Sequence, residues 1–393
     1  MNLAIQYGYG MKELCKELLS KMPGMSIILS PRDLSDKQII NYSNEFIALG
    51  GRTFIDSQLY APHSNHKQLT KHAFWPASFS TGMFMGKNSL RKIIRELSDL
   101  NKKAGTSRFI LPGIFCNNMG NTWKDIQNLI FSVANEVDGD KVATIVLSSQ
   151  VIRDIHQVDN LIEYIADCPY NEVYLLVEHP NGDYLVQDPL WLTNFLYISA
   201  SIKRINKRLI VGYGNQQLLC LGLANIDELA SGTWLNVRSF SLSKFFETDE
   251  VKRKNTWYYC PQAFTEYTLV FLDLAFQQQI LPPFKQDDNY SSNYADILFA
   301  GALPSTTAFS EPLAFRHYLL CLYDQCKHIS EGSFDNRVKS FNEMLVEANK
   351  VLDFARSHSI SGQKRDFFDC IEVVQASVDT FVRMHGPLLS RLW

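Results

Sequence analysis

The sequence predicts an α/β protein built on a TIM-like (β/α)8 barrel and followed by a C-terminal helical extension. Short β-rich runs alternate with longer runs of helical period from residue 25 to about residue 234, the pattern of parallel strands joined by crossover helices. The strand-like runs are apolar throughout, as expected for strands buried on both faces. Seven such runs with their helices fit a barrel better than a doubly wound sheet.

The expected strands are residues 27–29, 53–56, 109–114, 143–147, 173–177, 209–212 and 228–232. An eighth strand is expected from residues 2–6 or from the segment near 251–259. Apolar residues recur with helical spacing between the strands, over residues 35–49, 88–101, 121–137, 151–166, 189–205 and 216–224.

The pattern changes after about residue 238. A polar stretch, 239–255, precedes an apolar helix near 263–279 and a loop rich in Pro, Asp, Asn and Ser at 281–293. Helical spacing returns over residues 311–327, 336–358 and 366–385. We therefore expect a barrel in residues 1–310 and a helical extension, 311–393, that packs on the barrel rather than folding independently.

Composition and charge narrow the class of protein. The chain has 393 residues, with 38 Lys and Arg against 41 Asp and Glu, so no global field attracts a polyanion and a nucleic-acid role would need a local patch. The eight cysteines form no CxxC pair, which suggests buried thiols in a reducing compartment. No signal peptide or membrane-spanning run is evident, and we expect a cytoplasmic protein with no membrane partner.

Working residues of a (β/α)8 barrel project from the carboxyl ends of its strands. Asp56 ends an apolar run there, where it could act as a general base or accept N–H donors from a purine-like edge; capping of the next turn is an equal alternative. Asn117 and Asn118 offer amides to a ligand, although turn-forming Asn is the commoner explanation. Gln150 follows the next strand.

Two further strand ends carry candidate residues. Glu178 follows four apolar residues, and a carboxylate there is costly to bury unless it is paired or used. Gly212 and Gly214 would let the backbone approach a ligand closely, but their spacing matches no phosphate-binding motif.

Metal and phosphate chemistry receive little support. The histidines at 63, 66 and 72 and the Cys321–Cys326–His328 group do not match zinc spacing, so surface histidines and core cysteines are the simpler interpretation and no metal is predicted. Among the basic clusters, only the one at residues 252–254 merits a test for phosphate contacts.

The residues at two strand ends resemble the tRNA-guanine transglycosylase superfamily, zinc-carrying (β/α)8 barrels that exchange guanine for a 7-deazaguanine base. The Phe-Ile-Asp-Ser stretch at 54–57 is similar to the family's Asp-Ser-Gly-Gly-Phe-Gln motif, whose Asp contacts the base, although Gln-Leu-Tyr replaces Gly-Gly-Phe. The segment 209–238 resembles the family's strand–Gly–helix–Gly-Ile-Asp-Met-Phe-Asp segment. Residues 315–319 and 342–356 look like the family's two C-terminal helices.

The resemblance implies roles residue by residue, and it also shows departures. It makes Asp56 the base-contacting residue and puts Ala230 where the family has its nucleophilic Asp. The family's base-reading Gln maps to Ser148 or Gln150. Its second base-contacting Asp maps near Asn117 or Asn118. The Cys-x-Cys-x2-Cys zinc cluster of the family is missing, because residues 303–313 contain no cysteine.

Three functions follow as hypotheses. The first is a barrel that binds a guanine or 7-deazaguanine group at Asp56 without the usual nucleophile and without a cofactor, like divergent family members in antiphage CBASS operons, with a QueC-like enzyme or its target as protein partner. The second is an active base-exchange enzyme on nucleic acid that uses Asp227 or Glu178 as nucleophile, since a small error in register would favour Asp227. The third is a non-catalytic scaffold whose C-terminal helices bind protein. The resemblance also implies a dimer.

Overall fold

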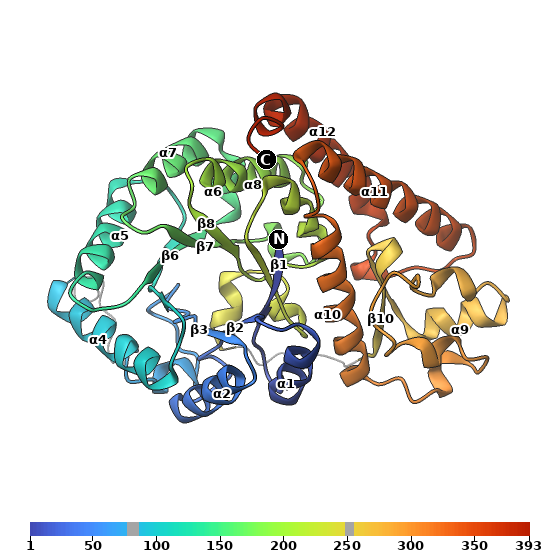
Figure 1. The fold of residues 1–393 in the computed structure, drawn as a ribbon, viewed down its shortest axis with the longest axis horizontal. Coiled ribbons are helices and arrows are strands. Elements are labelled where there is room, and N and C mark those ends of the chain that lie inside the picture. The colour runs from blue at the N-terminus through green and yellow to red at the C-terminus, as the bar shows by residue number, and fades with distance from the viewer. Residues whose placement is uncertain (77–85, 248–254) are drawn as a thin grey trace.

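The computed structural model describes residues 1–76, 86–247 and 255–393, and in this part of the chain nine parallel strands form one curled sheet, eight of them along a continuous path (Figure 1). These eight are β1 (Asn2–Gln6), β2 (Ser26–Leu29), β3 (Arg52–Ile55), β4 (Phe109–Ile110), β6 (Lys141–Leu147), β7 (Glu172–Val177), β8 (Arg208–Val211) and β9 (Glu228–Ser231). Their order in the sheet is β3-β2-β1-β9-β8-β7-β6-β4. Except for β3 and β4 at its two ends, strands that are consecutive in sequence thus lie side by side along this path, and the last strand of the barrel, β9, pairs with the first, β1.

The sheet curls until its two edge strands meet. The Ser107 amide, just before β4, donates to the Thr53 carbonyl of β3 at 3.0 Å. The predicted barrel is confirmed, and residues 2–6 supply its eighth strand.

One expected strand is divided in the structure. Residues 109–114 were predicted as a single strand, but only β4 and a separate two-residue strand, β5 (Phe115–Cys116), pair with β6. Pro112 lies between them and has no N–H to give to a sheet.

Helices surround the sheet (Figure 1). Those that follow the barrel strands are α1 (Lys12–Lys21), α2 (Asp36–Ala48), α4 (Lys87–Ala104), α5 (Asn121–Ala134), α6 (Ser149–Arg153), α7 (Ile155–Ala166) and α8 (Pro189–Arg204). Between β8 and β9 the chain forms a 3₁₀ segment, Gln216–Ala224, instead of the expected α-helix. Every residue of that segment is buried, and a Cβ at Gly222 would lie 2.8 Å from the Ile329 side chain.

The C-terminal third adds a small hairpin and four helices. The hairpin strands are β10 (Trp257–Cys260) and β11 (Thr265–Thr268), and the helices are α9 (Leu269–Gln277), α10 (Glu311–His328), α11 (Phe334–Ser357) and α12 (Phe368–Leu389). The helix expected from residue 263 begins only at Leu269, because residues 265–268 pair with β10. Helix α10 contacts both β1 and α1, which places it in the helical layer of the barrel, directly after the predicted boundary at residue 310.

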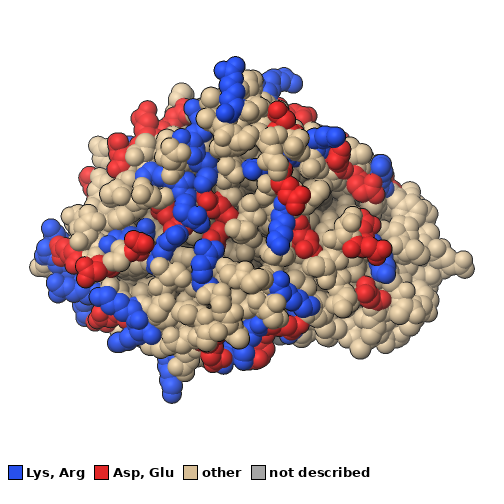
Figure 2. Space-filling view, in the orientation of Figure 1, with Lys and Arg blue, Asp and Glu red and all other residues tan. Residues whose placement is uncertain are grey.

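Ion pairs join the amino ends of the barrel strands. The first residues of β8 and β7, Arg208 and Glu172, lie 3.3 Å apart, and those of β3 and β9, Arg52 and Glu228, lie 3.0 Å apart. Figure 2 shows acidic and basic side chains interspersed over the face in view. These ion pairs have a structural role, because the working residues of a (β/α)8 barrel lie at the opposite, carboxyl ends of the strands.

The remaining whole-chain features are simple. All eight cysteine side chains are buried free thiols. No helix in the described ranges combines the length and apolar character needed to cross a bilayer.

Candidate binding site at the barrel mouth

The Asp56 carboxylate lies directly after β3, at the carboxyl end of the barrel, and the residue is only 1% exposed. Its Oδ1 accepts the Gln58 amide at 3.0 Å. Its Oδ2 accepts three phenolic hydroxyls, those of Tyr174 at 3.2 Å, Tyr213 at 3.3 Å and Tyr60. A buried carboxylate thus has hydrogen bonds to both oxygens, which is the condition for keeping it inside a protein.

The donors come from separate parts of the barrel. Tyr174 belongs to β7, whereas Tyr213 follows β8 and Tyr60 follows β3. Gln58 connects these loops, because its Nε2 donates to Tyr213 Oη at 3.0 Å and to Ser30 Oγ, after β2, at 3.0 Å. Gln58 and Tyr213 both have positive φ, 55° and 56°, an uncommon conformation that the surrounding hydrogen bonds maintain.

The environment changes the acidity of this carboxyl group. Burial raises the pKa of Asp56 from 3.8 to about 6, although the hydroxyl and amide donors favour the charged form and limit the rise. A carboxyl group with a pKa near 6 can exchange a proton close to neutral pH, so Asp56 has the acidity of a general base as well as of a hydrogen-bond acceptor.

Aromatic rings cover the Asp56 cluster. The Tyr60 ring packs edge-on against Phe240 at 5.3 Å and Phe245 at 4.9 Å, and the Tyr213 ring packs against Phe240 at 5.5 Å. Phe240 and Phe245 lie in the connection that follows β9. Phe240 and Phe245 therefore cover the tyrosines that bind Asp56, and because the carboxylate is buried, a ligand can reach it only if side chains at the mouth move.

The predicted glycines make room for side chains of the protein itself. A Cβ at Gly212 would lie 2.6 Å from the Tyr174 ring and 2.3 Å from Leu176. A Cβ at Gly214 would lie 2.4 Å from Leu229. Gly212 thus allows Tyr174 to pass beneath β8 and reach Asp56.

We expect Gly212→Ala to lower the free energy of unfolding by about 1–3 kcal/mol, because the added methyl group overpacks the Tyr174 ring. Urea denaturation measures the change. Gly120→Ala is the control, since its Cβ would meet nothing nearer than Asn118 Oδ1 at 3.6 Å and its φ of −81° suits alanine. Equal stability of the two variants would contradict the packing role of Gly212.

The predicted amide side chains lie on the rim of the barrel, apart from Asp56. Asn117 and Asn118 directly follow β5, and Gln150 lies in α6 after β6. All three are exposed, and none is among the residues that hydrogen-bond to Asp56. A ligand held by Asp56 and these amides together would have to extend from the interior to the rim.

The two candidate nucleophiles occupy opposite ends of the barrel. Glu178 is half-buried at the carboxyl end of β7, where its Oε1 accepts the Leu242 amide at 3.4 Å and so holds the connection that covers Asp56. Asp227 precedes β9, at the amino end, where its Oδ2 accepts Lys203 Nζ at 2.6 Å and the Leu209 amide at 2.8 Å. Because the strands are parallel, the structure does not bring Asp227 and Asp56 together, and Asp227 serves there as an ion-pair partner.

The site residues that the sequence analysis missed are the tyrosines around Asp56. Tyr174 is a hydroxyl-bearing residue inside an otherwise apolar run, which was a usable signal. Its hydroxyl also donates to Gln6 Oε1 at 3.0 Å, so Gln6 at the end of β1 belongs to the same network. Tyr213 gives no such signal, since it lies between two glycines in a loop.

Other candidate regions contribute less. The basic cluster at 252–254 lies outside the described residues. Within the described ranges, no group of three or more His, Cys, Asp and Glu side chains is arranged to hold a metal ion.

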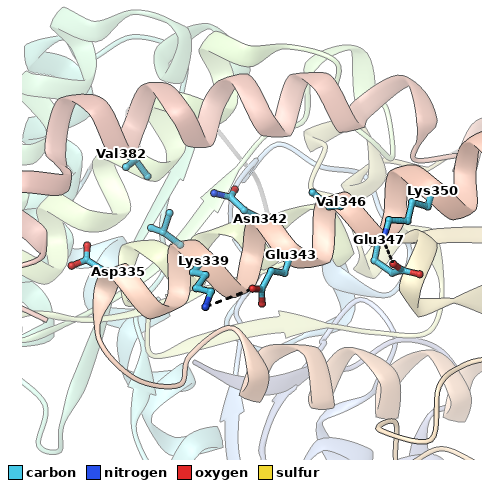
Figure 3. A pocket seen from close by; sticks show the side chains of 9 residues that line it. Asp335, Lys339, Asn342, Glu343, Val346, Glu347, Lys350 and Val382 are labelled. Atoms are coloured by element: carbon cyan, nitrogen blue, oxygen red, sulfur yellow. Dashed lines mark hydrogen bonds and ion pairs between the residues drawn. The ribbon is translucent and has the colours of Figure 1, made fainter.

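A hollow of about 760 Å³ lies along α11 and reaches Val382 of α12 (Figure 3). Four of its charged side chains form two pairs, Lys350 with Glu347 at 3.1 Å and Lys339 with Glu343 at 3.9 Å. Exposed pairs of this kind are solvated and weak, and the hollow offers no buried polar group to a ligand.

Comparisons with known proteins add little. No protein-family model matches the chain, and no curated protein sequence matches it. A structure of dihydrodipicolinate synthase from Acinetobacter baumannii is 14% identical, with a TM-score of 0.34 over 59% of this chain and 69% of that chain. A deoxyribose phosphate aldolase from Aeropyrum pernix is 10% identical, with a TM-score of 0.32 over 57% and 90%. Similarity this low carries no argument about function.

Proposed function

We propose that the protein is a barrel that binds a guanine or 7-deazaguanine group at Asp56 and acts as an accessory to a deazaguanine-dependent modification in antiphage defence. The observation that carries the proposal is the buried Asp56 carboxylate at the carboxyl end of β3, with three hydroxyl donors on one oxygen. The proposed protein partner is a QueC-like enzyme or its target.

The arrangement of donors supports binding of an N–H edge. A carboxylate oxygen offers about two lone-pair directions, yet Asp56 Oδ2 receives hydroxyls from Tyr60, Tyr174 and Tyr213. One hydroxyl can therefore give way to a ligand N–H without leaving the carboxylate unpaired. Guanine carries N–H donors on the ring and on the exocyclic amine, which suit the two oxygens of one carboxylate.

The surroundings of Asp56 favour binding over covalent base exchange. Among the described residues, none that hydrogen-bonds to Asp56 carries a second carboxylate. Ala230 is buried inside β9, and Asp227 lies at the far end of the barrel. A displacement through a covalent intermediate needs a carboxylate or another nucleophile beside the bound base.

The scaffold hypothesis finds no support in α10. That helix is enclosed between β1 and α1 on one side and β10 on another, and it has no exposed large apolar side chain. A protein-binding surface normally needs an accessible apolar centre, so α10 is not a suitable one.

Calorimetric titration with guanine, 7-cyano-7-deazaguanine and 7-aminomethyl-7-deazaguanine tests the proposal. We expect saturable binding of at least one base and a loss of about tenfold or more in affinity for Asp56→Asn, because an amide replaces the charged acceptor. Asp353→Asn, on the exposed face of α11, is the control and should bind like the unmodified protein. Absence of heat from folded protein, or equal affinity of the Asp56→Asn variant, would refute base binding at Asp56.

A further inference from the structure

A second cavity, of about 540 Å³, opens at the carboxyl ends of β1 and β9. Its walls come from the segment after β9, the β10–β11 hairpin, α10 and the turn at Arg365. None of the residues that line it hydrogen-bonds to Asp56. It is therefore a separate site at the barrel mouth, with a volume in the range of small-molecule pockets.

A buried ion-pair group forms the floor. Glu266, 2% exposed, accepts Arg238 Nη1 at 3.1 Å, Arg365 Nη1 at 2.7 Å and the Tyr184 hydroxyl at 2.9 Å. The Arg238 guanidinium lies 3.4 Å from the centre of the Tyr318 ring. Glu266 and Arg238 are thus fixed in position by the fold, which gives the cavity a rigid floor.

Arg365 differs from Arg238 because it reaches the cavity. Its side chain is 18% exposed and lies 4.1 Å from the centre of the Trp257 ring. Within the described part of the chain, its guanidinium donates only to Glu266. A guanidinium has five N–H donors, so Arg365 retains donors for an acceptor on a ligand.

Two lining residues carry buried polar atoms without a partner. Neither Thr233 Oγ1 nor Asn236 Oδ1 has a hydrogen-bond partner among the described residues, and Thr233 is only 3% exposed. Leaving such atoms unpaired costs about 1–3 kcal/mol each, and they are uncommon in folded proteins. Both atoms have almost no accessible surface, so a molecule in the cavity could pair with them only after their side chains rotate toward it.

The walls are aromatic. Trp234 packs edge-on against Phe315 at 4.9 Å, and Trp257 of β10 also lines the cavity. Indole rings bind flat heteroaromatic rings by stacking. The charged lining residues balance in number, with two arginines, Arg238 and Arg365, and two glutamates, Glu266 and Glu311, so recognition does not depend on a net ligand charge.

We propose that this cavity binds the base of a purine nucleoside or nucleotide. The ring lies among Trp234, Trp257 and Phe315, Arg365 donates to a ring or carbonyl acceptor, and Asn236 Oδ1, after rotation of its side chain into the cavity, accepts a ring or amino N–H. Purines satisfy both needs because their edges carry donors and acceptors together. The site goes beyond the proposed base at Asp56 and does not depend on it.

Calorimetric titration with guanosine, adenosine, cytidine and their 5′-monophosphates tests the proposal. We expect saturable binding of a purine compound, with affinity reduced about tenfold in Asn236→Ala and in Arg365→Gln. Asn236→Ala removes no intramolecular hydrogen bond of Oδ1, so the fold should be retained. Arg356→Gln is the matched control, because Arg356 also pairs with a carboxylate, Asp369 at 3.2 Å, and lies over a ring, Phe368 at 3.7 Å.

The Asp56→Asn variant separates this site from the base site. We expect it to bind the purine nucleoside with unchanged affinity, and a monophosphate that binds more tightly than its nucleoside would identify nucleotides as the ligands. No saturable heat with any compound would overturn the proposal. So would binding that is lost in Asp56→Asn and retained in Arg365→Gln.

Discussion

Replacing Glu266 with glutamine is expected to lower the free energy of unfolding by about 3–5 kcal/mol, the usual effect of breaking a buried ion pair from one side. Burial opposes ionisation of Glu266, but Arg365 and Arg238 outweigh it and hold the pKa of Glu266 below its usual value. Glutamine removes the charge and leaves the enclosed Arg238 guanidinium without a counterion. Urea denaturation at neutral pH measures the loss.

An exposed pair provides the control for this change. Glu343 lies 3.9 Å from Lys339 on α11, and both side chains are more than half exposed, at 67% and 77%. Glu343→Gln should change stability by less than about 0.5 kcal/mol, because solvent screens such pairs. A loss below about 1 kcal/mol for Glu266→Gln would show that Glu266 does not stabilise the junction of barrel and hairpin.

The barrel could be predicted because its signal is local. Strands such as β6 and β7 are buried on both faces and so consist of consecutive apolar residues, which are visible in the sequence. The errors arose where a non-local contact decides local structure. Residues 265–268 were included in the helix expected near 263–279, yet pairing with β10 makes them a strand.

The candidate site could be predicted only in part, for the same reason. Asp56 was found from its place at a strand end, and it lies at the barrel mouth. Its donors Tyr174 and Tyr213 are 118 and 157 residues away in sequence, so closure of the barrel, and no local pattern, brings them to it. Glu266 and Arg365, 99 residues apart, meet for a similar reason, because the turn before α12 returns to the hairpin.

Asp227 illustrates how a small shift in register changes a role. A residue directly after a barrel strand lies at the mouth, whereas a residue directly before one lies at the opposite end. Asp227 became a candidate nucleophile through alignment with a motif, although the expected strand 228–232 already put it before the strand, and β9 does begin at Glu228. The predicted start of this strand was correct, and it decides which end of the barrel the carboxylate occupies.

The raised pKa of Asp56 predicts a pH-dependent difference between the unmodified protein and Asp56→Asn. The folded protein keeps this proton up to about pH 6, whereas the unfolded chain releases it near pH 3.8. The folded state thus binds more protons between these values, and the unmodified protein loses stability as pH rises through this window. The difference in pKa corresponds to about 3 kcal/mol. Asparagine has no proton to release, so the free energy of unfolding of the variant should rise by up to that amount, relative to that of the unmodified protein, between pH 4 and pH 6.5.

Urea denaturation of both proteins at half-unit steps from pH 4 to pH 7 measures the effect, with Asp353→Asn as an exposed control whose profile should parallel that of the unmodified protein. Parallel profiles for Asp56→Asn would mean that Asp56 titrates normally. If the variant gains stability relative to the unmodified protein as expected, the same ionisation leaves a destabilised carboxylate that a ligand N–H can compensate. Affinity for the proposed base should then rise across the pH range in which the unliganded protein loses stability, because a charged acceptor binds an N–H more strongly than a neutral one.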